Sequence, residues 1–162
     1  MEERALSEYF EQDHGRLDSL FRSYQALKRS DFPKAKEAFK QFRFGLQRHI
    51  VWEEELLFPV WEQKTGLAEG GPTSVMRMEH RQIGRWLEAI HDRVRAQDLE
   101  SDEAEERLIA VLESHNRKEE RILYPAIDQA LDEEERASIY TAMLEMPRER
   151  YEVCCGGHEA GA

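Results

Sequence analysis

Apolar side chains recur every three or four residues along most of this chain, which is the spacing of amphipathic helices. Leu6, Phe10, Leu17 and Phe21 form one such stripe near the N-terminus. The pattern predicts four long helices and a shorter fifth one, over residues 5–29, 33–64, 74–97, from 102 past 127, and 132–146. No segment has the alternating pattern of a strand.

The predicted helices are separated by short breaks that contain Gly, Pro, Ser or Asp. Four long amphipathic helices with short connections pack as an antiparallel bundle. We therefore expect an all-α, up-down-up-down four-helix bundle with a short fifth C-terminal helix, over residues 1–146. Residues 147–162 have no periodicity and are expected to form a flexible Gly- and Cys-containing tail. Cys154, Cys155 and His158 in this tail could bind metal or change redox state, but the poor bridging geometry of adjacent cysteines favours free thiols.

Composition and charge narrow the function classes. Hydrophobic residues make up 40% of the chain and charged residues 35%, and no apolar run approaches the roughly 20 residues that span a bilayer. The net charge of -11, without a basic run, disfavours nucleic acid as a partner. The N-terminus does not resemble a secretory signal, so we expect a cytoplasmic protein without a membrane partner.

An internal repeat is the most informative feature of the sequence. The segments 49–59 and 115–125 both begin with His, carry Glu four and five positions later, and end Leu, aromatic residue, Pro. His14 and His80 are separated by the same 66 residues, and each follows an acidic residue. The chain therefore contains two helical hairpins of one design, with equivalent kinks expected at Pro59 and Pro125.

The repeated residues are candidates for a metal site. Each of the four histidines lies on the apolar stripe of its helix, and a glutamate four residues after a histidine faces the same way. Buried carboxylates are unfavourable unless they are paired or bound to metal, and His together with carboxylate suits iron, manganese or zinc. The candidate ligands are His14, His49, Glu53, His80, His115 and Glu119. Asp13 and Glu79 each stand next to a candidate histidine but lie far around the helix from it, whereas Asp18, four residues after His14, is a further candidate for supporting a histidine.

On these residues the chain resembles the hemerythrin-like, or HHE cation-binding, family. The resemblance covers about residues 5 to 130 and rests on the Asp-His and Glu-His pairs together with the two His-x-x-x-Glu-Glu segments. It implies a four-helix bundle around two non-haem irons and a small ligand such as dioxygen. By position, His14 and His49 would serve one iron, His80 and His115 the other, with Glu53, Glu119 and an oxo, hydroxo or water ligand as bridges.

The sequence departs from the oxygen carriers of that family at one ligand. The carriers have a fifth histidine one turn after the third-helix histidine, where this chain has Gly84. We therefore expect a nearly symmetric and more open site, which favours redox chemistry over simple oxygen transport. The carriers also take their last carboxylate five residues after the histidine, at Glu120 here; the internal repeat favours Glu119.

Three functions remain open from the sequence. The first is a di-iron protein that binds dioxygen, nitric oxide or peroxide for sensing, scavenging or storage. The second is a di-metal oxidase or peroxidase that uses the same site, because an open coordination position can activate oxygen or peroxide. The third is a metal-free helical interaction domain, which leaves the shared offset of 66 residues unexplained. The sequence identifies no protein partner, and we expect a monomer or a dimer.

Overall fold

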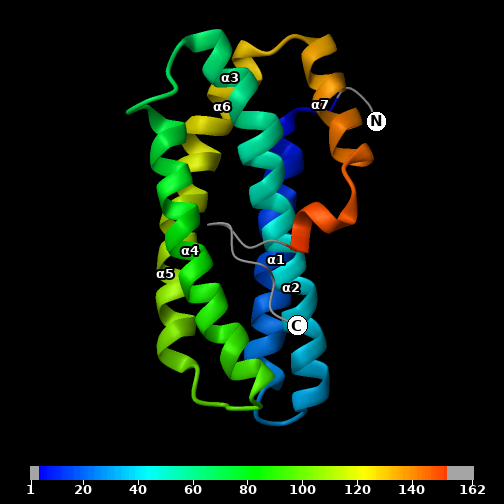
Figure 1. Cartoon of the computed structure of the whole chain (residues 1–162), viewed down its shortest axis with the longest axis vertical. Helices are drawn as coiled ribbons and strands as arrows, with labels where there is room; N and C mark the ends of the chain where they lie inside the picture. Colours follow the sequence, from blue (N-terminus) through cyan, green and yellow to red (C-terminus); the bar gives the residue numbers. More distant parts are fainter. Residues whose placement is uncertain (1–3, 153–162) are drawn as a thin grey trace.

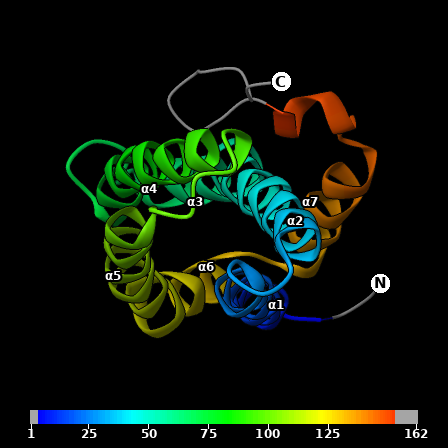
Figure 2. The same ribbon diagram turned by 90° about the horizontal axis from the view of Figure 1, so that it is seen from below.

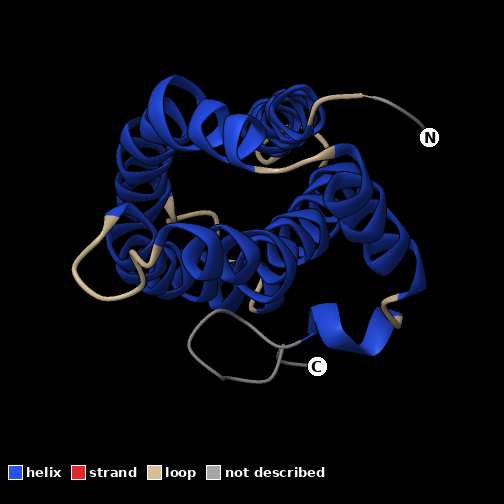
Figure 3. Cartoon of the chain, turned by 90° about the horizontal axis from the view of Figure 1, so that it is seen from above, coloured by secondary structure: helices blue, strands red, loops and turns tan. Residues whose placement is uncertain are grey.

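The computed structural model describes residues 4–152, and in that range the chain is helical without a strand (Figures 1 and 3). Helix α1 spans Leu6–Leu27 and α2 spans Phe32–Trp52; α4 spans Pro72–Arg95 and α5 spans Asp102–Lys118. Helix α1 packs along α2, and α4 packs along α5. Seen from below, the four helices surround a common interior (Figure 2). The all-α four-helix bundle expected from the periodicity is confirmed.

The helix boundaries follow local sequence signals. Asp31 caps the start of α2 by accepting a hydrogen bond from the backbone N–H of Lys34, and Pro33 occupies the first helical turn. Pro72 begins α4 in the same way. Gly66 adopts the left-handed conformation that terminates a helix, with φ of 72°. The short connections at 28–31 and 96–101 then turn the chain back at the lower end of the bundle (Figure 1).

Both prolines of the repeat lie inside continuous helical rods. Helix α2 continues through a π-helical turn, Glu53–Leu57, into α3, Phe58–Thr65. Helix α5 likewise continues through Glu119–Leu123 into α6, Tyr124–Ala130. A proline lacks the N–H that the regular ladder requires, and the wider turn before each proline accommodates the missing donor. The two prolines therefore occupy equivalent places in their rods, each following a π turn.

The chain remains ordered beyond the boundary expected at Met146. Helix α7, Glu133–Glu145, starts with a capping box formed by Asp132 and Glu135. A 3-10 helix, η3, follows over Arg148–Glu152. The buried Tyr151 accepts a hydrogen bond of 2.8 Å from the indole N–H of Trp52. This contact fixes the start of the expected tail against α2, whereas Cys154, Cys155 and His158 lie outside the described residues.

The apolar core is divided into two clusters along the length of the bundle. One contains Phe10, Leu57 and Tyr124 near the α3 and α6 end, and the other contains Leu17, Phe21 and other residues toward the opposite end. His14 lies between Phe10 and Leu17 on α1, so a polar layer crosses the bundle between the clusters. Within residues 4–152, no helix combines the length and apolar character needed to cross a bilayer.

Candidate metal centre

The six predicted ligands come together in the polar layer. All six are buried: His14, His49, Glu53, His80, His115 and Glu119. Helix α1 supplies His14, α4 supplies His80, and the two rods that contain π turns supply the two His and Glu pairs. The residues therefore come from four different rods, and each reaches the interior because its position lies on the apolar stripe.

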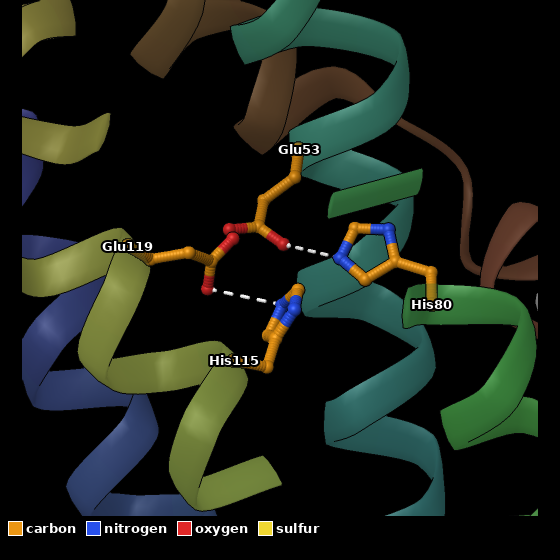
Figure 4. A group of neighbouring side chains, drawn as sticks. All are labelled: Glu53, His80, His115 and Glu119. Carbon is orange, nitrogen blue, oxygen red and sulfur yellow. Dashed lines mark hydrogen bonds and ion pairs between the residues drawn. The ribbon is translucent and has the colours of Figure 1, made fainter. Parts of the chain in front are cut away.

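Their donor atoms form two neighbouring groups. Ligand atoms of His14, His49 and Glu119 lie within 4.8 Å of one another, and so do those of Glu53, His80, His115 and Glu119. Figure 4 shows the second group, with the two carboxylates facing each other across the site. The division of the histidines into a first pair and a second pair agrees with the sequence prediction.

The two carboxylates lie between the groups. Glu53 Oε1 is 3.0 Å from His80 Nε2, while its Oε2 is 3.5 Å from His49 Nε2. Glu119 Oε1 is 3.2 Å from His14 Nε2 and 3.3 Å from His115 Nε2. Each carboxylate thus contacts one histidine of each pair, as a bridging ligand must.

One atom of the site lacks a partner. Glu119 Oε2 is buried and has no hydrogen-bond partner within residues 4–152. A buried carboxylate oxygen without a partner is strongly unfavourable, and two facing buried carboxylates also repel each other. Cations bound between the two groups would give this oxygen a partner and would offset the repulsion between the carboxylates. The donor set of four imidazoles and two carboxylates fits iron, manganese or zinc.

Every candidate histidine donates its outer N–H to a carboxylate. His14 Nδ1 lies 2.6 Å from Glu120 Oε2, and its repeat equivalent His80 lies 2.6 Å from Glu54. The other two bonds are 2.9 Å each and join His49 to Asp13 and His115 to Glu79. This arrangement directs each Nε2 lone pair inward and fixes the tautomer, as in carboxylate-histidine-metal triads.

The supporting carboxylates correct part of the sequence interpretation. Asp13 and Glu79 do not serve the histidines next to them but those of the neighbouring helix, because adjacent residues point about 100° apart. Asp18 is largely exposed and pairs with Arg22, so it plays no part in the site. Glu120 is 38% exposed and binds the outer nitrogen of His14, whereas Glu119 is fully buried between the groups. The geometry therefore favours Glu119 as the inner carboxylate.

Electrostatics couple the histidines to these carboxylates. Burial by itself lowers the pKa of His49, but Glu53 and Asp13 outweigh that effect and raise the pKa to about 10. Burial likewise lowers the pKa of His115, but Glu119 and Glu79 outweigh it and raise the pKa to about 10. Burial raises the pKa of Glu53, yet His49 holds it well below its ordinary value. The raised pKa values favour the protonated forms of His49 and His115 in the metal-free site, so these two histidines must lose protons when a metal binds.

Sequence reasoning missed the π turns that shape the site. Each begins at the inner glutamate, and the N–H of the aromatic residue five positions later bonds to that glutamate's carbonyl, from Phe58 to Glu53 and from Tyr124 to Glu119. Such turns are frequent at functional sites. The extra residue of the π turn rotates the following aromatic side chain toward the polar layer. The paired Pro59 and Pro125 were the available signal, because the missing N–H requires a local change of helix type.

Tyr124 is the residue that sequence reasoning overlooked. Its hydroxyl is 2.6 Å from Glu53 Oε2 and 3.0 Å from Glu119 Oε1. Phe58 occupies the equivalent place in the other hairpin, where its ring stacks on His80 at an interplanar angle of 5°. The two halves of the site therefore differ in what surrounds the candidate ligands: one half faces a phenol and the other a benzene ring.

A cavity of about 640 Å³ leads to the site between α1 and α5. Its wall includes His14, His49 and His115 together with apolar residues such as Phe21 and Leu112. Charged residues lie among the lining, with Asp18, Arg22, Glu113, Arg117 and Arg121 as examples. The cavity gives small molecules a route to both histidine pairs. Gly84 is buried one turn after His80 and adds no side chain at the position of the carriers' fifth histidine.

Comparison with known proteins gives one extensive match and several short ones. The family model described as the hemerythrin HHE cation binding domain matches residues 5–142. The iron-sulfur cluster repair protein YtfE of Edwardsiella ictaluri is 47% identical over 48 residues, which are 30% of this chain and 22% of that protein. The YtfE of Escherichia coli K12 is 44% identical over 45 residues, 28% and 20% of the two chains. The chain thus spans about a fifth of the length of these curated relatives.

No solved structure matches the chain significantly. The family match nevertheless covers most of the sequence, including all four inward histidines and both inner glutamates. The helical architecture and the two clusters of donor atoms agree with it. The chain therefore belongs to the hemerythrin HHE cation-binding family.

Proposed function

We propose that this protein is a non-haem di-iron protein that binds dioxygen, nitric oxide or peroxide for sensing, scavenging or storage. The observation that supports it best is the set of four buried histidines, each with Nδ1 on a carboxylate and Nε2 directed into the layer. A core that only needed to satisfy buried histidines would not require four such pairs around two converging glutamates. The similarity to proteins named for iron-sulfur cluster repair is consistent with iron as the metal.

The residues divide into two proposed half-sites. His14 and His49 would hold one ion, His80 and His115 the other, and Glu53 and Glu119 would contact both, with an oxo, hydroxo or water bridge. Manganese and zinc share these ligands. Bound iron would supply a redox-active centre with affinity for small oxygen- or nitrogen-containing ligands. The chain's own part is to orient the imidazoles through the four outer carboxylates and to surround the pair with apolar side chains.

The cavity between α1 and α5 is the proposed entry for the ligand. Its walls near the histidines are formed by apolar residues such as Leu17, Phe42 and Ile83. An uncharged diatomic molecule crosses such a lining more readily than an ion does. The net charge of -11 without a basic run supports a protein without a nucleic-acid partner.

One observation favours the second candidate, a di-metal oxidase or peroxidase. A cavity of about 640 Å³ is far larger than a diatomic ligand requires and lies within the range of pockets for small organic molecules. An organic reductant bound between α1 and α5 would lie beside His14 and His115. Turnover of peroxide with such a reductant, well above that of free iron, would favour this candidate over a binding role.

Elemental analysis of the freshly purified protein, with its ultraviolet-visible spectrum, tests the proposal. We expect two irons per chain and oxo-to-iron charge-transfer bands. Changing His49 or His115 to Ala should abolish stoichiometric iron and these bands, because each side chain supplies an inward Nε2 to one half-site.

His91→Ala is the matched control, because His91 is a partly buried histidine on α4 that stacks on Phe39, away from the polar layer that holds the six candidate ligands. This variant should keep both irons. Full iron retention in both His49→Ala and His115→Ala would refute the proposed site. A stoichiometric single zinc in the unaltered protein would refute the di-iron proposal.

A further inference from the structure

The hydroxyl of Tyr124 lies at the meeting point of four candidate ligand atoms. It is 2.6 Å from Glu53 Oε2, 3.0 Å from Glu119 Oε1 and 3.2 Å from each of the Nε2 atoms of His14 and His49. All four of these atoms belong to the first half-site or to its bridges. The phenol reaches them from the first residue of α6, directly after the π turn.

These distances are those of donors that share one ion. Nitrogen and oxygen ligands lie about 2.1 Å from a metal of this type, so neighbouring donors at right angles are about 3.0 Å apart. The four distances from the Tyr124 oxygen lie around that value. A phenol that served only to satisfy one carboxylate would have no reason to be equally far from two imidazole nitrogens.

In the form of the site that binds metal, in which the histidines are neutral, hydrogen bonding alone does not account for this position. Each of the two histidines donates its Nδ1 hydrogen to a carboxylate, to Glu120 from His14 and to Asp13 from His49. In the neutral form that binds metal, each Nε2 is then an acceptor. The single phenol hydrogen faces four acceptors and can satisfy only one of them, whereas a cation among the five atoms would satisfy all.

Among residues 4–152, the other half-site has no such donor. Phe58 corresponds to Tyr124 in the repeat, and both rings stack on the histidine of the facing helix: Phe58 on His80 at 6.0 Å and Tyr124 on His14 at 5.7 Å between centroids. The two aromatic residues thus occupy equivalent places and differ by one oxygen atom. Gly84, one turn after His80, leaves the second half-site without a further side chain there as well.

We propose that Tyr124 is a ligand of the ion held by His14 and His49, and that the ion held by His80 and His115 keeps the position for the exogenous ligand. Tyr124 would supply its phenolate oxygen to a bound ferric ion, and the proton of the broken O–H bond would pass to solvent without electron transfer. The inference rests on the proposed di-iron function. In the family's oxygen carriers the fifth histidine follows the third-helix histidine, so the ion with more protein ligands is the one held by that helix. In this chain the additional ligand would instead belong to the ion held by His14 and His49.

Visible absorption and resonance Raman spectra of the ferric protein test this proposal. The unaltered protein should show a phenolate-to-iron charge-transfer band with enhanced tyrosine ring vibrations, which shift when the protein contains ring-deuterated tyrosine. Tyr124→Phe should lose the band completely while retaining two irons. Tyr24→Phe is the matched control, because Tyr24 is a buried, hydrogen-bonded tyrosine beside Ser101 and Glu105 at the far end of the bundle, and it should keep the band.

Three results would overturn the inference. A ferric protein with two irons and no tyrosine ring enhancement would exclude a phenolate ligand, and this measurement on the unaltered chain does not depend on whether Tyr124→Phe folds. A band that persists in Tyr124→Phe would assign it to another residue. A chain that takes up no iron would refute the proposed function as well, and metal analysis identifies that case before any spectrum is recorded.

Discussion

The roles of Glu119 and Glu120 provide a sharp test of the geometry, because the two neighbours differ in burial and in the atom that they contact. Glu119 is fully buried and touches the inward Nε2 of His14 and of His115. Glu120 is 38% exposed and touches only the outer Nδ1 of His14. Replacing each with Gln keeps the shape of the side chain and removes its charge. We expect Glu119→Gln to hold at most one ion, since both half-sites lose an anionic ligand.

The expected effect of Glu120→Gln is smaller and can be calculated. Loss of a carboxylate that supports a ligating histidine weakens metal affinity about 10- to 100-fold, which is about 1.4–2.7 kcal/mol at one half-site. At saturating iron the same free energy is lost from folding stability. For a domain of this size that corresponds to a fall in Tm of roughly 3–11 °C. The metal-free proteins lack this contribution to the free energy of unfolding. For each variant, the difference in Tm from the unaltered protein with iron, compared with the same difference without iron, therefore isolates the contribution of iron.

Iron content by elemental analysis, chelator competition and thermal unfolding with and without iron measure these quantities. Glu106→Gln is the control, because it removes an exposed carboxylate from the same helix, α5. The reasoning fails if Glu120→Gln loses both ions while Glu119→Gln retains them. It also fails if both variants match the control, because the inner carboxylates would then contribute nothing to metal binding.

Further predictions concern pH, stability and ligand entry. Iron affinity should rise with pH in competition titrations between about pH 6 and 9, because His49 and His115, each with a pKa raised to about 10, must lose protons to bind. By the same sign, their contribution to the metal-free fold is full below the ordinary value of 6.5 and is lost as pH rises through about 10; a pH-independent affinity would contradict both statements. Lys28→Met should reduce the free energy of unfolding in denaturant by about 3–5 kcal/mol, since it leaves the buried Glu105 without its cation. Replacing Lys28 and Glu105 together by Met and Leu should recover most of that loss. Leu112→Trp should slow ligand binding in stopped flow while iron content stays at two, because residue 112 lines the cavity between α1 and α5; an unchanged rate would place the entry elsewhere.

The sequence alone determined the helices and which candidate ligands face the interior of the bundle. Helical periodicity fixes which side chains of a segment share a face, so the stripe through Phe10 and Leu17 placed His14 inward before any contact was known. The repeat of 66 residues then paired His14 with His80 and indicated two equivalent hairpins. Both conclusions depend on local geometry and on internal comparison, and neither requires knowledge of which helices are neighbours.

Only the tertiary structure decided the contacts between helices. Asp13 lies next to His14 in sequence but binds His49, because the direction of a side chain around its own helix decides which neighbour it meets. Tyr124 reaches the histidine of α1 because a π turn rotates it inward and α6 packs beside that helix. The 3-10 helix after Met146 is ordered by the contact of Tyr151 with Trp52, 99 residues away in sequence. Such partners are set by the packing of whole rods, which periodicity within one rod cannot specify.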